Sequence, residues 1–220
     1  MILTQDLLTF IVTVYIVLVV QLTLTFTIVY LLRNDDYASI RDSVKQLNIL
    51  IYIILPLLLI FGYGFLPKNT SIYIRFIIVT FFNLLMGILI YLISEDEEDD
   101  ILESAMLSTV ITFIGITILG FICYYLGYDT RWMGIYLSAA LIGLIITRIV
   151  MIFRKPSNQT KIYVTYFAIM LFSLYILFDT NTVMINSYKL NKEDYVSPAL
   201  NFYIDFINLF LNYFRLEELE

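Results

Sequence analysis

Seven apolar runs follow one another along almost the whole chain. Each is close to the ~20 residues that an α-helix needs to cross a hydrocarbon core of about 30 Å. The runs cover roughly 7–32, 47–66, 71–93, 101–126, 132–153, 162–185 and 197–216. Because a chain in lipid must satisfy its own backbone hydrogen bonds, runs of this length predict helices. The expected fold is an all-α membrane protein, a seven-transmembrane-helix bundle.

Composition narrows the class of protein and of chemistry. The 220 residues are 60% hydrophobic, and the connecting loops are too short for a separate soluble domain, so residues 1–220 are expected to form one transmembrane domain. The net charge of −6, without a basic stripe, argues against nucleic acid as a partner. There is no histidine and a single cysteine, Cys123, which excludes imidazole ligands, histidine-based catalysis and an intramolecular disulfide. No cofactor is expected.

Polar residues recur along one side of the last apolar run. They are spaced three or four residues apart, which gathers them within roughly 80° of one helix face. An aspartate at mid-depth of such a helix costs about 2.5 to 3.5 kcal/mol on insertion, so it predicts a function. We expect this stripe to face protein, with lipid on the other sides, and its asparagines to line a pathway beside Asp205. The stripe consists of Ser197, Asn201, Asp205, Asn208, Asn212 and Arg215.

A second aspartate, Asp179, lies about three-quarters of the way along the sixth run. Two carboxylates that meet in a low dielectric cannot both ionise easily, and they tend to share a proton. A protonated pair joins two helices by a hydrogen bond, whereas an ionised pair repels and offers oxygen ligands to a cation such as Ca²⁺. The hypothesis is that Asp179 and Asp205 form a pH sensor and bind calcium transiently. The alternative is that Asp179 only caps or snorkels at a helix end.

Two further charges within the runs, Arg215 and Glu103, allow two interpretations each. Arg215 lies ten residues beyond Asp205, about 15 Å along a helix, so it either gates the mouth of the pathway through an ion pair or snorkels. Glu103 opens the fourth run and is either such an ion-pair partner or a group that favours the helix dipole. Arg75 and Arg148 lie near the ends of runs, which predicts ordinary snorkelling to the headgroups.

The carboxyl-terminal residues resemble the Bax-inhibitor-motif family. That family shows an aromatic-Asp-Thr sequence in its sixth helix, a Glu-Asp/Glu-Tyr approach, and a Leu-Tyr-Leu-Asp-Ile-Ile-Asn-Leu-Phe core ending in Leu-Arg. The matching segments here are 178–180 (Phe-Asp-Thr), 191–195 (Asn-Lys-Glu-Asp-Tyr) and 200–211 (Leu-Asn-Phe-Tyr-Ile-Asp-Phe-Ile-Asn-Leu-Phe-Leu). Upstream, the resemblance depends on helix count, on spacing and on residues 101–109.

The resemblance implies a seven-helix fold with the last helix central. It also implies a pH-sensitive pathway that leaks Ca²⁺ from stores, a restraint on apoptosis, and an endomembrane of endoplasmic-reticulum or Golgi type rather than the plasma membrane. The family's sensing aspartates fall on Asp179 and Asp205, and its terminal arginine falls on Arg215. Run 47–66 departs from the family because it carries no charge.

Two other functions must be weighed against a leak pathway. One is a non-conducting protein whose partners, besides the bilayer, are membrane cell-death regulators or channels. The other is an intramembrane aspartyl protease, which also uses two aspartates. The chain contains Pro198-Ala199-Leu200, but this precedes Asp205 in the same run, and Asp205 does not follow a Gly-x-Gly. We therefore expect no enzyme.

Overall fold

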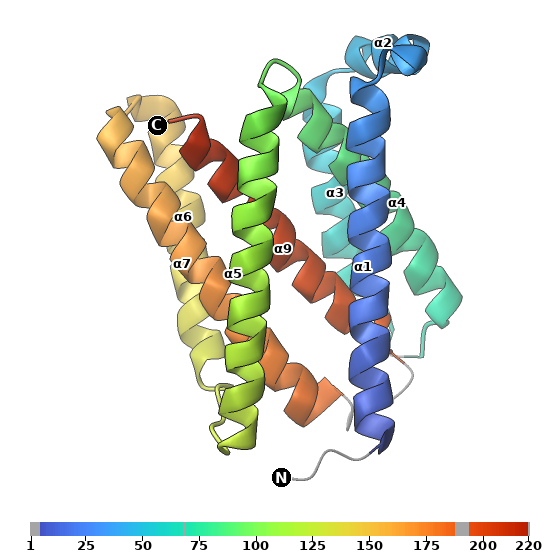
Figure 1. Cartoon of the computed structure of the whole chain (residues 1–220), viewed down its shortest axis with the longest axis vertical. Helices are drawn as coiled ribbons and strands as arrows, with labels where there is room; N and C mark the ends of the chain where they lie inside the picture. Colours follow the sequence, from blue (N-terminus) through green and yellow to red (C-terminus); the bar gives the residue numbers. More distant parts are fainter. Residues whose placement is uncertain (1–4, 68, 188–193, 220) are drawn as a thin grey trace. The chain divides into compact units, whose positions relative to one another are not determined.

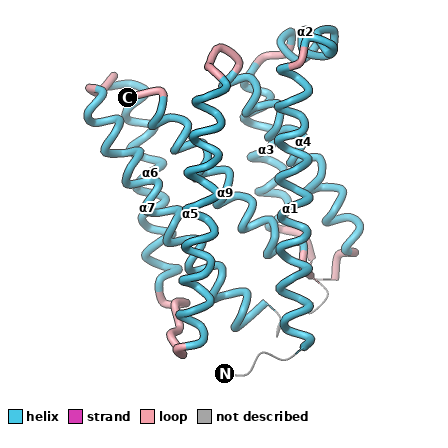
Figure 2. The backbone as a smooth tube through the Cα atoms, viewed as in Figure 1, coloured by secondary structure: helices cyan, strands magenta, loops and turns pink. Residues whose placement is uncertain are grey.

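The computed structural model describes residues 5–67, 69–187 and 194–219. Of the described residues, 87% are helical and none lies in a strand. Short loops join the helices, as Figure 2 shows. An all-helical fold agrees with the sequence pattern, because backbone in hydrocarbon must satisfy its own polar groups.

Seven long helices cover the seven apolar runs (Figure 1). Five of them are long and apolar enough to cross a membrane: α1, α4, α5, α6 and α7. A π-helical turn, Val183–Ser187, continues α7. The helix bounds are α1 Gln5–Arg33, α3 Ile49–Gly64, α4 Ile72–Ser94, α5 Asp99–Tyr125, α6 Met133–Arg154, α7 Asn158–Thr182 and α9 Val196–Glu217.

A short helix that the apolar pattern does not reveal precedes α3. It consists of a 3₁₀ turn, Asp35–Tyr37, followed by α2, Ala38–Gln46, and it is bent by 81° from α3. If this bent pair counts as one span, the candidate spans number six among the described residues. The protein is therefore a multi-pass membrane protein, with fewer clear spans than the seven predicted. Helix α9 is not among them, since the polar stripe lowers its hydropathy.

Capping side chains fix several helix ends. Asn48 accepts a hydrogen bond from the backbone N–H of Leu50 at the start of α3, and Ser157 accepts one from that of Thr160 at the start of α7. At α9, Asp194 Oδ1 accepts from the N–H of Ser197 at 3.0 Å. Each cap satisfies an amide that has no partner within its own helix.

The chain forms two compact units, which we describe separately. The α1–α4 unit contains residues 12–97 and 193–200, so it holds most of α1 and the first turn of α9. The α5–α7 unit contains residues 1–11, 98–192 and 201–220, so it holds the rest of α9.

In the α1–α4 unit, helix α1 approaches α4 closely at Gly87. A Cβ atom at this position would lie 2.7 Å from the carbonyl oxygen of Thr25, and the Thr25 hydroxyl donates to the carbonyl of Asn83 at 3.2 Å. At the end of α1, Arg33 donates to the carbonyl oxygens of Ser94 and Glu97, both at 2.7 Å. The unit's core includes Leu32, Val44, Tyr52, Leu85 and Tyr91.

In the α5–α7 unit, helix α7 packs against both α5 and α6. The contact with α5 is closest at Gly120, where a Cβ atom would lie 2.7 Å from both Cβ and Cγ2 of Thr180. Thr180 cannot easily yield, because it is buried and its hydroxyl donates to the carbonyl of Ile176 at 2.7 Å. The absence of a side chain at Gly120 therefore sets the spacing between α5 and α7 next to Asp179.

We expect Gly120→Ala to destabilise the protein by about 1–3 kcal/mol, because the added methyl group overpacks this contact. The measurement is the unfolding midpoint of the purified protein on titration with sodium dodecyl sulfate, followed by circular dichroism. Gly115→Ala is the matched control on the same helix, since a Cβ there meets nothing within 4 Å. The control should be neutral or slightly stabilising, and equal effects of the two substitutions would contradict the close contact.

Candidate functional site

The structure brings Asp179 of α7 and Asp205 of α9 into one pocket of the α5–α7 unit. The pocket has a volume of about 280 Å³ and receives side chains from α6, α7 and α9. The lining residues are Leu141, Phe172, Tyr175, Phe178, Asp179, Asn201, Ile204 and Asp205. Asp179 and Asp205, which are 26 positions apart in the sequence, thus line the same pocket.

Both carboxyl groups are withdrawn from the surface. Asp179 is 8% exposed and Asp205 is 4% exposed. Within the described residues, Oδ2 of Asp205 is buried without a hydrogen-bond partner, and no lysine or arginine forms an ion pair with either aspartate. A buried carboxylate without a counter-charge is costly, so this arrangement favours a state in which the pair holds a proton or a cation.

The helix end around Asp179 is a structured part of the α5–α7 unit, in which the side chains of Asp179, Thr180 and Asn181 are buried. Asn181, two residues further on, is fully buried and fixes the loop between α5 and α6. Its Oδ1 accepts from the N–H of Thr130 at 3.1 Å, and its Nδ2 donates to the carbonyl of Tyr128 at 2.9 Å. The sequence pattern did not predict this anchoring contact.

The asparagines of the polar stripe lie in different surroundings. Asn201 is exposed and lines the aspartate pocket. Asn208 donates to the carbonyl of Ile204 at 2.8 Å, one turn earlier on its own helix. Asn212 is buried, donates to the carbonyl of Asn208 at 2.6 Å and accepts from the Arg148 guanidinium through its Oδ1.

The expectation that the other faces of α9 contact lipid is wrong. Phe202, Tyr203 and Leu209 have no exposed surface, and Phe210 is 1% exposed. Phe202 and Phe206 both pack edge-on against the ring of Phe113 on α5. The aromatic side chains of α9 are therefore part of the protein core.

Arg215 and Glu103 lie apart from the aspartate pocket. Arg215 lines a second pocket with Arg148 and Lys161, and Glu103 is exposed on the first turns of α5. No ion pair joins Arg215 to Glu103 in the described structure. The roles of these two residues as gate or ion pair stay predictions.

Arg75 does not snorkel, contrary to expectation. It is 7% exposed, its Nη1 lies 3.6 Å from Oδ2 of Asp194, and the same nitrogen donates to the Ser197 hydroxyl at 3.2 Å. Its Nη2 donates to the carbonyl of Pro67 at 3.0 Å, and its guanidinium lies 5.6 Å above the ring of Tyr63. The position of Arg75 within an apolar run could have predicted this contact, because a charged side chain in such a run usually pairs with a buried partner.

Calcium coordination needs six to eight oxygen ligands, more than the aspartates supply. The described residues contain no group of three or more Asp, Glu, Cys or His side chains that could hold a metal ion. Two carboxylates and the nearby amide of Asn201 fit a weak, transient contact with a passing cation better than a permanent metal site.

The fold and the site define a class: a multi-pass helical membrane protein with a pair of buried aspartates on two neighbouring helices. The chain belongs to the family described as "Inhibitor of apoptosis-promoting Bax1", whose model matches residues 7–217. The resemblance drawn from the carboxyl-terminal residues is thereby confirmed.

Curated relatives come from plants, viruses and animals. Protein LIFEGUARD 1 of Arabidopsis thaliana is 33% identical over 112 residues, which are 51% of this chain and 46% of that protein. The Golgi anti-apoptotic protein of Vaccinia virus (strain Lister) is 36% identical over 91 residues, 41% of this chain and 36% of the viral protein. Protein lifeguard 3 of Homo sapiens is 28% identical over 211 residues, 92% of this chain and 66% of the human protein. The matched regions thus span between about a third and two thirds of these relatives.

Proposed function

We propose that this chain is a pH-sensitive Ca²⁺ leak pathway in an endomembrane of endoplasmic-reticulum or Golgi type. By lowering the Ca²⁺ content of a store it would inhibit apoptosis. Membership of the Bax-inhibitor family supports the anti-apoptotic part, and the name of the viral relative supports a Golgi-type membrane. The observation that carries the proposal is the single pocket shared by Asp179 and Asp205.

In this proposal the seven long helices all cross the membrane, and α9 is the central one. Burial of the apolar side chains of α9 supports that position, since a helix at the lipid boundary would expose them. Asn201 then forms the polar entrance to the aspartate pocket, and Asn208 and Asn212 continue the polar route along α9 toward Arg215.

The aspartate pair acts as the switch. At acidic pH one proton shared between Asp179 and Asp205 removes a charge and joins α7 to α9 by a hydrogen bond, which closes the route. At alkaline pH both carboxylates ionise, repel each other and offer oxygen ligands to Ca²⁺. The route is then open. Its conductance is low because a bound Ca²⁺ ion must dissociate from both carboxylates before it can move on.

Two ionisable groups outside the pocket, Asp129 and Lys45, are poor candidates for this response. The chain has no histidine. In the loop before α6, the guanidinium of Arg131 lowers the pKa of Asp129 to about 2, so Asp129 stays ionised across the physiological range. A hydrogen bond to Glu95 raises the pKa of Lys45 in α2, so Lys45 stays protonated over the same range.

We expect purified protein in liposomes to leak Ca²⁺ faster at alkaline than at acidic pH. The measurement is the rate of fluorescence increase of a Ca²⁺ dye trapped inside the liposomes, at a series of pH values. Empty liposomes report the passive leak of the bilayer. A rate that does not depend on pH, or one no higher than in empty liposomes, would contradict an intrinsic pathway and favour a protein that acts by binding other membrane proteins.

A further inference from the structure

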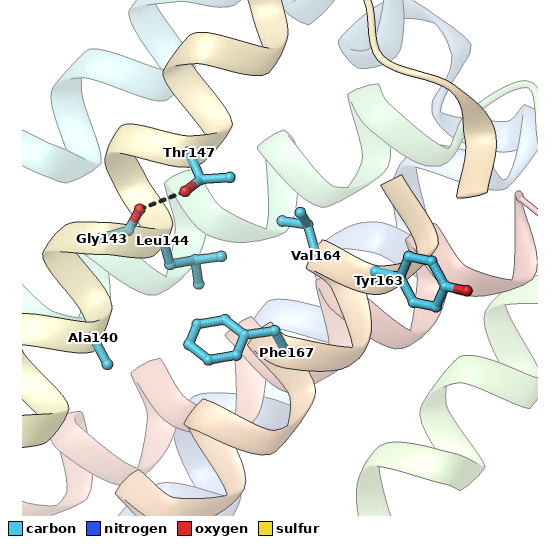
Figure 3. Close-up of a pocket in the computed structure, with 7 residues that line it drawn as sticks. All are labelled: Ala140, Gly143, Leu144, Thr147, Tyr163, Val164 and Phe167. Carbon is cyan, nitrogen blue, oxygen red and sulfur yellow. Dashed lines mark hydrogen bonds between the residues drawn. The ribbon is translucent and has the colours of Figure 1, made fainter. Parts of the chain in front are cut away.

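An apolar groove runs between α6 and α7 in the α5–α7 unit. It has a volume of about 410 Å³ and is open on one side. In Figure 3, Val164 and Phe167 of α7 face Leu144 and Thr147 of α6, and the Thr147 hydroxyl donates to the carbonyl of Gly143 at 2.8 Å. Gly143 leaves the groove open, because a Cβ atom there would meet nothing within 4 Å. The groove is therefore suited to bind a hydrocarbon chain.

A cationic pocket continues this groove toward the end of α6 that leads into the α6–α7 loop. It has a volume of about 320 Å³ and is lined by Arg148, Lys161 and Arg215 together with apolar residues. Val164 lines both the groove and the cationic pocket. The groove residue Thr147 directly precedes Arg148 in α6, and Gly143 lies five positions earlier, about 8 Å along the helix.

The positive charges of the cationic pocket are not neutralised by the described residues. The Arg148 guanidinium donates to Oδ1 of Asn212, and its Nε is buried without a hydrogen-bond partner among the described residues. Arg215 lines the same pocket as Arg148, and the Lys161 ammonium donates to Oδ1 of Asn158 at 3.2 Å. Grouping like charges beside hydrocarbon is unfavourable unless an anion binds among them.

The acid closest to Arg215 in sequence, Glu217, does not supply that anion. Glu217 lies two positions beyond Arg215, on a different face of α9, and its Oε1 accepts a hydrogen bond from the Ser104 hydroxyl of α5 at 2.6 Å. Among the described residues, none of the three cations of the pocket forms an ion pair. Within the described part of the chain, no ion pair balances the charge of this pocket.

We propose that the groove and the cationic pocket together bind an anionic phospholipid. The phosphate group lies between Arg148 and Arg215, within reach of Lys161, and one acyl chain follows the groove past Gly143. Guanidinium groups suit phosphate oxygens because they offer paired donors. Basic pockets between transmembrane helices bind anionic headgroups by this chemistry. A free phosphate ion would use the cations but not the apolar groove, which is why we assign a lipid.

The test is native mass spectrometry of the purified protein in detergent, with phosphatidylglycerol or phosphatidylcholine added at equal concentration. The parent protein should retain more phosphatidylglycerol than phosphatidylcholine. The double variant Arg148→Gln/Arg215→Gln should bind it about tenfold more weakly, or weaker still, as expected for the loss of two phosphate contacts. The control Arg154→Gln removes an exposed charge of α6 that does not line the pocket, and it should leave binding unchanged.

A second variant separates the lipid from a phosphate ion. Gly143→Leu places a side chain in the groove at a position where a Cβ atom meets nothing within 4 Å, so it should keep the melting temperature and weaken retention of phosphatidylglycerol. Inorganic phosphate added in excess should not displace the lipid. Equal retention by Arg148→Gln/Arg215→Gln and Arg154→Gln would overturn the site. Displacement by inorganic phosphate, together with unchanged binding in Gly143→Leu, would overturn the assignment of a lipid.

Discussion

Replacing Arg75 by Met should destabilise the protein by about 3–5 kcal/mol, the usual cost of removing one partner from a buried ion pair. The substitution preserves most of the side-chain volume and leaves Asp194, whose side chain is 15% exposed, without its cation. Asp194 also caps α9 through Ser197, so strain at this carboxylate should reach the helix that carries Asp205. The measurement is the unfolding midpoint in sodium dodecyl sulfate.

Two further variants show whether the charge is responsible. Adding Asp194→Asn to Arg75→Met removes the orphaned charge, keeps a side chain that can cap α9, and should restore a large part of the lost stability. Arg41→Met breaks the pair with Asp35, whose side chain is 95% exposed, and should have little effect, as expected for a surface ion pair. A small effect of Arg75→Met, or no recovery in the double variant, would show that Arg75 contributes by packing alone.

Asp205→Asn should remove most of the pH dependence of the Ca²⁺ leak. The amide has nearly the shape of the carboxyl group, but it cannot ionise, so Asp179 would no longer face a second titrating carboxylate. We expect the leak to become similar at acidic and alkaline pH, measured with the dye-loaded liposomes described above. Asp129→Asn is the matched control. Its carboxylate is already ionised throughout this range, so that variant should keep the parent's response.

The same variant separates the leak from partner binding in cells. If Asp205→Asn loses the pH response in liposomes and still protects cells from apoptosis, the protection comes from binding to other membrane proteins. If protection is lost as well, while the amount of protein in the membrane is unchanged, the leak accounts for it. A pH response as strong as the parent's would exclude Asp205 as the sensor.

Sequence periodicity was sufficient to predict where the long helices lie and to single out Asp179 and Asp205 as a pair. A helix in hydrocarbon needs about 20 apolar residues, so the long helices begin and end close to the apolar runs. Asp205 stood out because a charge at mid-depth is expensive, and Asp179 because it is the nearest comparable charge in the preceding run. Both aspartates were therefore identifiable from one sequence, because each is a charged residue inside an apolar run.

Contacts between residues that are far apart in the sequence could not be predicted from periodicity. Arg75 and Asp194 are far apart in sequence, and an arginine near the end of a run usually snorkels, so nothing local indicated their contact. Arg148 and Arg215 had the same appearance when taken singly, and only the fold groups them in one pocket. Helix α2 is short and polar, so it falls below the length at which an apolar pattern is visible.

The most direct test of the account is a double-mutant cycle on the Ca²⁺ leak, using the parent, Asp179→Asn, Asp205→Asn and the double variant at acidic and alkaline pH. If the two carboxyl groups share a proton, either single substitution should remove most of the pH response, and the second should add little. Four proteins with the same pH response, or two single effects that simply add, would show that Asp179 and Asp205 do not act as a pair.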